Sequence, residues 1–144
     1  MSRYRGRVSG PLLDRIDLVV EVPVETKDAM KLWQARSDPT NETAVSAERV
    51  AAAREFALAS RSEESPNSRL EGRALLTAAR LSREADRLLA DATSRWSLSA
   101  RAVHRTLRVA RTVADFAASE QIAAEAIGEA LSFRHETLRV EVMP

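Results

Sequence analysis

The chain has 144 residues, of which 44% are hydrophobic and only 4% aromatic, so its core must consist mainly of alanine, leucine and valine. The 22 basic and 21 acidic side chains give a net charge of +1, which excludes a uniformly cationic surface for nucleic acid. The lack of cysteine excludes a disulfide framework, and two histidines cannot form a metal site alone. Because no long apolar run or signal-peptide pattern is present, we expect a cytoplasmic, single-domain protein with no membrane partner.

The N-terminal 24 residues differ in pattern from the rest of the chain. Residues 16–22 read Ile-Asp-Leu-Val-Val-Glu-Val, a β-branched run stopped by Pro23 that predicts a short strand. The alternating pattern at 137–142 predicts a second strand, which we expect to pair with the first. Residues 25–44 mix charges with proline and asparagine and predict a linker.

From Ser46 onward the hydrophobic period is helical. Ser46 and Ser99 are expected helix caps, and Ser68 and Glu71 have the spacing of a capping box. The expected helices cover about residues 46–61, 68–79, 82–94, 99–118 and 119–133, and the fourth is the longest. The predicted fold is mainly α: a helical bundle over residues 45–134, with a strand-bearing arm at 1–24 and a tail at 135–144.

Arginine is the dominant cation, with 20 arginines against two lysines, beside 25 alanines. A composition of this kind is typical of GC-rich coding, so only arginines placed in a pattern carry information. The helix expected after Ser99 has such a pattern at about 100° per residue. Its polar face carries Arg101, His104, Arg105, Arg108 and Arg111, with no acidic residue before Asp115. Like charges at this spacing repel by a few tenths of a kcal/mol per pair. The face is therefore either solvated or turned toward an anion, such as a nucleotide phosphate or a DNA backbone.

Arg15 also has two interpretations from its sequence context. It either pairs locally with Asp14 or Asp17, or it is presented at the edge of a strand to the phosphate of a neighbouring subunit. The two histidines, His104 and His135, are expected to be incidental surface residues. The 144 residues contain no GxxxxGK[ST], HExxH or GxSxG motif, so we expect no catalysis and no bound cofactor from this polypeptide alone.

Three stretches, residues 5–23, 98–116 and 127–134, resemble magnesium-chelatase-like AAA+ ATPases of the ComM/YifB type. Residues 5–23, RGRVSGPLLDRIDLVVEVP, are similar to the end of that family's ATPase core. Residues 98–116, LSARAVHRTLRVARTVADF, and 127–134, IGEALSFR, resemble its C-terminal helical lid. The Leu-Leu-Asp-Arg motif is shared with magnesium-chelatase ATPase subunits, in which the next residues resemble Phe-Gly-Leu. This chain has Ile-Asp-Leu at 16–18, which favours the ComM branch.

The resemblance implies that the chain is the C-terminal part of a larger ATPase. Residues 1–24 would form the edge of the AAA+ core, 25–44 a linker and 45–134 the lid. The family implies a homo-hexamer that binds ATP and magnesium in the complete protein and drives DNA branch migration. Arg15 matches the family's arginine finger, which acts in trans, and Arg101 matches the sensor-2 arginine.

Other members of the arginine stripe have a less specific expectation. Arg105, Arg108 and Arg111 are candidates for contact with phosphate, DNA or a neighbouring subunit, and no metal ligand is implied. Two alternatives from other classes stay open. One is the ATPase subunit of a magnesium chelatase acting on a porphyrin. The other is a stand-alone helical module that binds DNA or protein through the arginine face.

Overall fold

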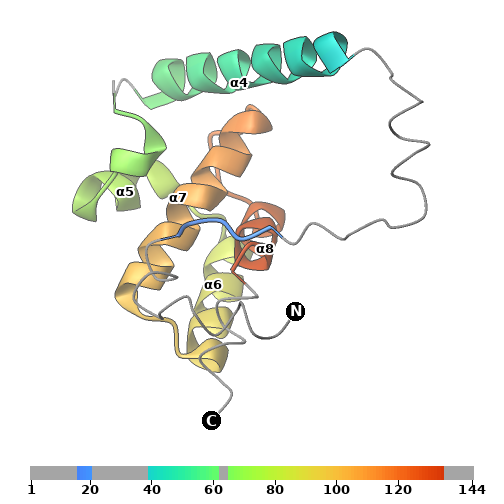
Figure 1. The fold of residues 1–144 in the computed structure, drawn as a ribbon. Helices are drawn as coiled ribbons and strands as arrows, with labels where there is room; N and C mark the ends of the chain where they lie inside the picture. Colours follow the sequence, from blue (N-terminus) through green and yellow to red (C-terminus); the bar gives the residue numbers. More distant parts are fainter. Residues whose placement is uncertain (1–15, 21–38, 62–64, 135–144) are drawn as a thin grey trace, which may run out of the picture.

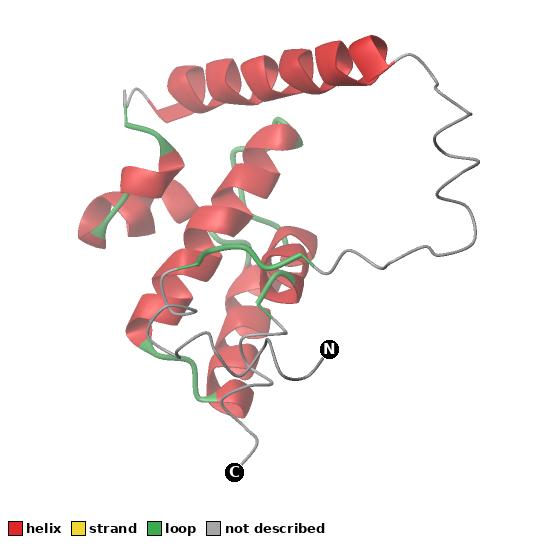
Figure 2. Cartoon of the chain, in the orientation of Figure 1, coloured by secondary structure: helices red, strands yellow, loops and turns green. Residues whose placement is uncertain are grey.

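The computed structural model describes residues 16–20, 39–61 and 65–134 of the chain. The expected mainly α fold is confirmed, because this part is almost entirely helical and Figure 2 shows no strand in it. In chain order the elements are α4 (Pro39–Arg61), the 3-10 helix η1 (Asn67–Arg69), α5 (Gly72–Ala79), α6 (Arg83–Trp96), α7 (Ala100–Phe116) and α8 (Ala124–Ser132). None of these helices is both long and apolar enough to cross a membrane.

Helices α6 and α7 are each capped by a serine: Ser82, where the helix over 82–94 was expected to begin, and Ser99, the expected cap. The Ser82 hydroxyl accepts a hydrogen bond from the Ala85 N–H at 3.1 Å, and the Ser99 hydroxyl accepts one from the Ala102 N–H at 3.2 Å. Each bond satisfies a backbone donor that the helix itself leaves unpaired. The starts of these two helices therefore agree with the local sequence signal.

The hydrophobic core lies where α5, α6, α7 and α8 meet (Figure 1). It consists mostly of leucine and alanine, as the composition predicts. The small side chains of Ala85, Ala110 and Ala130 are fully buried, which lets the helix backbones approach closely. Leu88 of α6 and Ala117, which follows α7, are exposed. The other central residues are Leu70, Leu75, Leu89, Leu107, Ile122, Ile127 and Leu131.

Two loops of the bundle pair with each other through the backbone. The Ser82 N–H donates to the Ile122 carbonyl at 2.9 Å, and the Ile122 N–H donates to the Arg80 carbonyl at 3.1 Å. This isolated parallel bridge joins the α5–α6 loop to the α7–α8 loop. It fixes the starts of α6 and α8 side by side at the buried Ile122.

Helix α4 extends further than predicted and is the longest described helix, with 23 residues against 17 in α7. It begins at Pro39, inside the expected linker. Proline suits the first helical position because its missing N–H would be unpaired there in any case. Figure 1 shows α4 lying apart from the bundle, and it approaches α7 through the buried Ala53.

Two expectations about the N-terminal arm and α5 are wrong. Residues 16–20 form no strand; they cross α7 and α8, and the Val19 N–H donates to the Phe133 carbonyl at 3.0 Å (Figure 1). The expected partner at 137–142 lies outside the described residues. Helix α5 starts at Gly72 rather than at the capping box, and Glu71 makes no side-chain cap. Gly72 has a φ of +49°, so the chain turns sharply here between η1 and α5.

Candidate functional site

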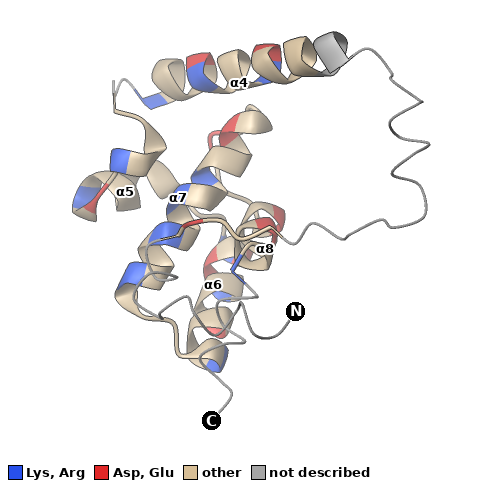
Figure 3. Ribbon diagram, viewed as in Figure 1, with Lys and Arg blue, Asp and Glu red and all other residues tan. Residues whose placement is uncertain are grey.

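Helix α7 carries the four arginines of the predicted stripe, and Figure 3 shows basic residues along its length. The structure gives these arginines different surroundings. Arg101 lies in the first turn, directly after the Ser99 cap, and its side chain is exposed. No acidic residue occupies that first turn, and Arg101 makes no ion pair with the described residues. Arg101 is therefore a cation presented to solvent at the positive end of a helix.

Arg105, one turn further along α7, is mostly covered. Only 11% of its side chain is exposed, and its Nε lies 3.3 Å from Oδ1 of Asp17. Its Nη1 is buried and makes no hydrogen bond with the part of the chain that the structure describes. Asp17 was one of the two local partners that the sequence offered for Arg15, but in the structure it pairs with Arg105. Arg15 itself lies outside the described residues.

Arg108 and Arg111 are used inside the fold. The Arg108 Nε donates to the Leu70 carbonyl at 3.0 Å. Arg111 is 1% exposed and donates to the carbonyl oxygens of Ala78, Ser119 and Glu120, with Glu120 at 2.7 Å. The expected place of Arg111 on an exposed face is therefore wrong. Its guanidinium is buried and donates to carbonyl oxygens at the end of α5 and in the loop that follows α7.

A buried carboxylate balances Arg111. Oδ1 of Asp115 accepts from Arg111 Nε at 3.1 Å, and both Asp115 oxygens accept from Arg61, at 2.7 and 3.0 Å. The Asn67 amide donates to Asp115 at 2.7 Å and accepts from Arg61 at 2.9 Å. Burial lowers the pKa of the Arg111 guanidinium, and the Asp115 charge opposes that shift. This network joins the end of α4, η1 and the end of α7.

The sequence did not indicate Arg61, Asn67 or Asp17 as partners of the α7 residues. Asp115 was visible as the first acid on the face, and its spacing of four from Arg111 is that of a helical ion pair. The contacts to Arg61 and Asn67 join residues 54 and 48 positions apart in the sequence, so no local signal marks them.

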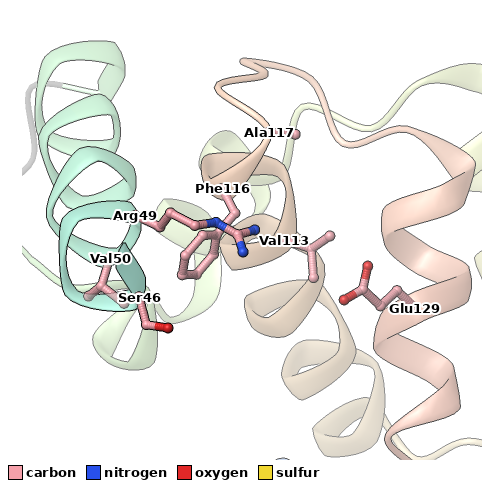
Figure 4. A pocket seen from close by; sticks show the side chains of 7 residues that line it. All are labelled: Ser46, Arg49, Val50, Val113, Phe116, Ala117 and Glu129. Carbon is pink, nitrogen blue, oxygen red and sulfur yellow. The ribbon is translucent and has the colours of Figure 1, made fainter. Parts of the chain in front are cut away.

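A groove separates α4 from α7 and α8. One hollow of about 550 Å³ is lined by residues of all three helices. Figure 4 shows the Arg49 side chain extending from α4 past Phe116 toward Val113, with Glu129 of α8 on the other side of Val113. A second hollow, of about 520 Å³, continues along α4 toward the Asp115 network. The described residues contain no cluster of three metal-ligating side chains. Of the four arginines on α7, Arg101 is the one whose side chain is exposed.

Comparison with known proteins places the chain in a family. Residues 40–134 match the family model described as magnesium chelatase, subunit ChlI C-terminal, and residues 1–30 match the model for magnesium chelatase, subunit ChlI. Among curated relatives, the uncharacterized protein YifB of Salmonella typhimurium is 36% identical over 92% of this chain. The competence protein ComM of Haemophilus influenzae is 33% identical over 93%, and the uncharacterized protein Rv2897c of Mycobacterium tuberculosis is 37% identical over 95%.

The chain spans about a quarter of the length of these relatives, 25% of YifB and ComM and 27% of Rv2897c. The first family model covers all of the described helical bundle, and the second covers the stretch that contains Arg15 and Asp17. All three stretches in which the sequence resembles this family therefore lie within matched residues. The chain belongs to the magnesium-chelatase-related family of ComM-like and YifB-like proteins.

Proposed function

We propose that the chain forms the lid and adjoining core edge of an AAA+ ATPase that couples ATP hydrolysis to movement on branched DNA. The observation that carries the proposal is the position of Arg101, the one arginine of the stripe that is exposed on α7. Family membership supports the same role, because Arg101 lies within the matched residues 40–134.

The electrostatics of Arg101 favour a phosphate ligand. The N-terminal end of a helix carries about half a positive charge, so a cation in the first turn destabilises the helix by about 0.3–1 kcal/mol. A phosphate group placed there would be attracted by both the helix end and the guanidinium. In the proposed ATPase, Arg101 reads the nucleotide phosphates, and α7 transmits the bound state to the rest of the bundle.

Arg15 has the complementary role in the proposal, and its support is the sequence resemblance. As an arginine finger it would reach the nucleotide of the neighbouring subunit and stabilise charge that develops on the γ-phosphate. A finger of this type contributes about 10³–10⁵ in rate. The assembly would be a homo-hexameric ring, with ATP and magnesium held by the remaining part of each subunit.

DNA is the proposed substrate because the resemblance to the ComM branch implies DNA branch migration, and the competence protein ComM is among the relatives. The packing of α7 favours an ATPase lid over a stand-alone DNA-binding module. Arg105 and Arg108 have partners within the chain and Arg111 is buried, so α7 presents no continuous basic face to a DNA backbone.

ATP turnover by the complete ATPase tests the role of Arg101. Arg101→Ala should weaken ATP binding by about tenfold or more, since a hydrogen bond to a charged group contributes about 1.5–3 kcal/mol. The control is Arg87→Ala, which removes an exposed arginine from α6 and should leave turnover unchanged. Equal ATP affinity and turnover in the Arg101 and Arg87 variants would overturn the proposed role.

A mixing experiment tests Arg15 separately. Arg15→Ala should lower kcat by about 10³-fold or more with little change in ATP affinity. If the residue acts in trans, subunits that carry Arg15→Ala should regain activity when mixed with subunits that keep Arg15 but cannot hydrolyse ATP themselves. Full activity of the Arg15→Ala homo-oligomer would contradict the assignment.

A further inference from the structure

We infer that Arg105 is a positioning residue that holds the segment bearing the arginine finger against the lid, through its ion pair with Asp17. The expected effect on ATP hydrolysis rests on the proposed function. The attachment of residues 16–20 to the bundle rests only on the contacts of these residues. Arg105 would then act through Arg15 and would not itself touch nucleotide.

Two contacts fasten this segment to the bundle. Nε of Arg105, on α7, lies 3.3 Å from the carboxylate of Asp17. The Val19 N–H donates to the carbonyl of Phe133, directly after α8, at 3.0 Å. The segment therefore bridges two helices that pack on each other (Figure 1). Ile16, Leu18 and Val20 are exposed, and only the Val19 side chain is half-buried, so apolar burial adds modestly to the ion pair and the backbone hydrogen bond.

Chain geometry connects this attachment to Arg15. Arg15 stands two positions before Asp17 in the sequence, so the attached segment leads directly to the proposed finger. Arg105 lies four residues after Arg101, one turn along the same helix, and so on the same side of it. A movement of α7 that follows nucleotide contact at Arg101 would therefore move Asp17.

The ion pair between Arg105 and Asp17 is weak enough to form and break without unfolding of the bundle. Asp17 is 47% exposed, whereas Arg105 is mostly covered. An ion pair with one exposed partner contributes modestly to stability, so its loss should loosen the segment without unfolding the bundle. Because a finger acts in the transition state, a loosened finger should lower kcat and leave the KM for ATP unchanged.

The test uses Asp17→Asn, with Asp17→Glu as the conservative variant that restores the charge. The matched control is Glu120→Gln, which removes the exposed Arg80–Glu120 pair at 2.7 Å from another part of the bundle. In this chain, hydrogen exchange of the Val19 amide should be about two- to fivefold faster in Asp17→Asn. It should be unchanged in Asp17→Glu and in Glu120→Gln. An unchanged rate in Asp17→Asn would overturn the attachment.

In the complete ATPase, Asp17→Asn should lower kcat by about two- to fivefold at constant KM for ATP, and Asp17→Glu should restore it. Arg105→Met, which keeps the aliphatic stem, should give the same loss. If Arg15→Ala abolishes turnover but Asp17→Asn and Arg105→Met do not alter kcat, the positioning role is wrong and the proposed function stands. If Arg15→Ala leaves turnover intact, the proposed finger is wrong, whereas the exchange of Val19 still reports on the attachment.

Discussion

Replacement of Asp115 by asparagine should strongly destabilise the bundle. The Asp115 carboxylate is 3% exposed and accepts hydrogen bonds from Arg61, Arg111 and Asn67 at 2.7–3.1 Å. Asparagine has nearly the same size, so the change leaves no cavity. It removes the negative charge and replaces one of the two accepting oxygens with an NH2 group, which donates. Arg111 and Arg61, whose side chains are 1% and 9% exposed, then lose their counterion.

The magnitude follows from the burial of these cations. Removal of one partner from a buried ion pair costs about 3–5 kcal/mol, because the remaining charge is desolvated without compensation. A domain of this size has about 5–15 kcal/mol of stability in total. At about 4 °C per kcal/mol, the expected fall in Tm for Asp115→Asn is about 12–20 °C.

Urea unfolding followed by far-UV circular dichroism measures this loss in the isolated chain. Glu120→Gln is the control, since its pair with Arg80 has side chains 49% and 67% exposed and should contribute less than about 1 kcal/mol. Adding Arg61→Met to Asp115→Asn removes one unpaired cation and should recover part of the loss. A loss below about 1 kcal/mol in Asp115→Asn would refute the view that this network joins α4 to α7.

Three further changes test the packing and the helix ends, each by thermal and urea unfolding. Ser99→Ala removes the hydroxyl that accepts from the Ala102 N–H and should cost about 0.5–2 kcal/mol. Gly128→Ala in α8 adds a methyl group into open space and should stabilise by about 0.5–1 kcal/mol, whereas Gly72→Ala, at a φ of +49°, should destabilise by about 1–2 kcal/mol. Leu75→Ala removes a fully buried side chain and should cost about 2–5 kcal/mol. Equal effects at the two glycines, or a Leu75 variant as stable as the parent, would contradict the structure.

The starts of α6 and α7 could be predicted because their signals are local. A serine at the cap and the apolar period that follows both lie within a few residues of the helix start. The same logic failed at α5. The capping-box spacing of Ser68 and Glu71 is present, but the left-handed Gly72 separates η1 from the helix. Burial of Leu70 between these two elements decides the path of the chain, and this depends on tertiary packing.

The environment of Arg111 could not be predicted from α7 alone. At 100° per residue, Arg111 lies about 80° around the helix from Arg101 and only about 40° from the buried Leu107. An arginine at the edge of the apolar face can point toward either solvent or the core. Arg111 points toward the core because it finds hydrogen-bond acceptors there. These are the carbonyl oxygens of Ser119 and Glu120, in the loop after α7, and the carboxylate of Asp115.

The contact between Asp17 and Arg105 shows the same limit at a longer range. The residues lie 88 positions apart, and the sequence offered Asp17 only as a local partner of Arg15. The β-branched run at 16–22 predicts a strand on local grounds, but residues 16–20 have no neighbouring strand within the part of the chain that the structure describes. There, the Val19 N–H donates to the Phe133 carbonyl.

The most direct measurement of the proposed function is steady-state ATP turnover by the complete ATPase, with and without branched DNA. We expect turnover to rise when branched DNA is added, and to fall to background in Arg15→Ala with or without DNA. If the rate of ATP turnover is unchanged both by branched DNA and by Arg15→Ala, the protein is not an ATP-driven DNA motor and Arg15 has no catalytic role.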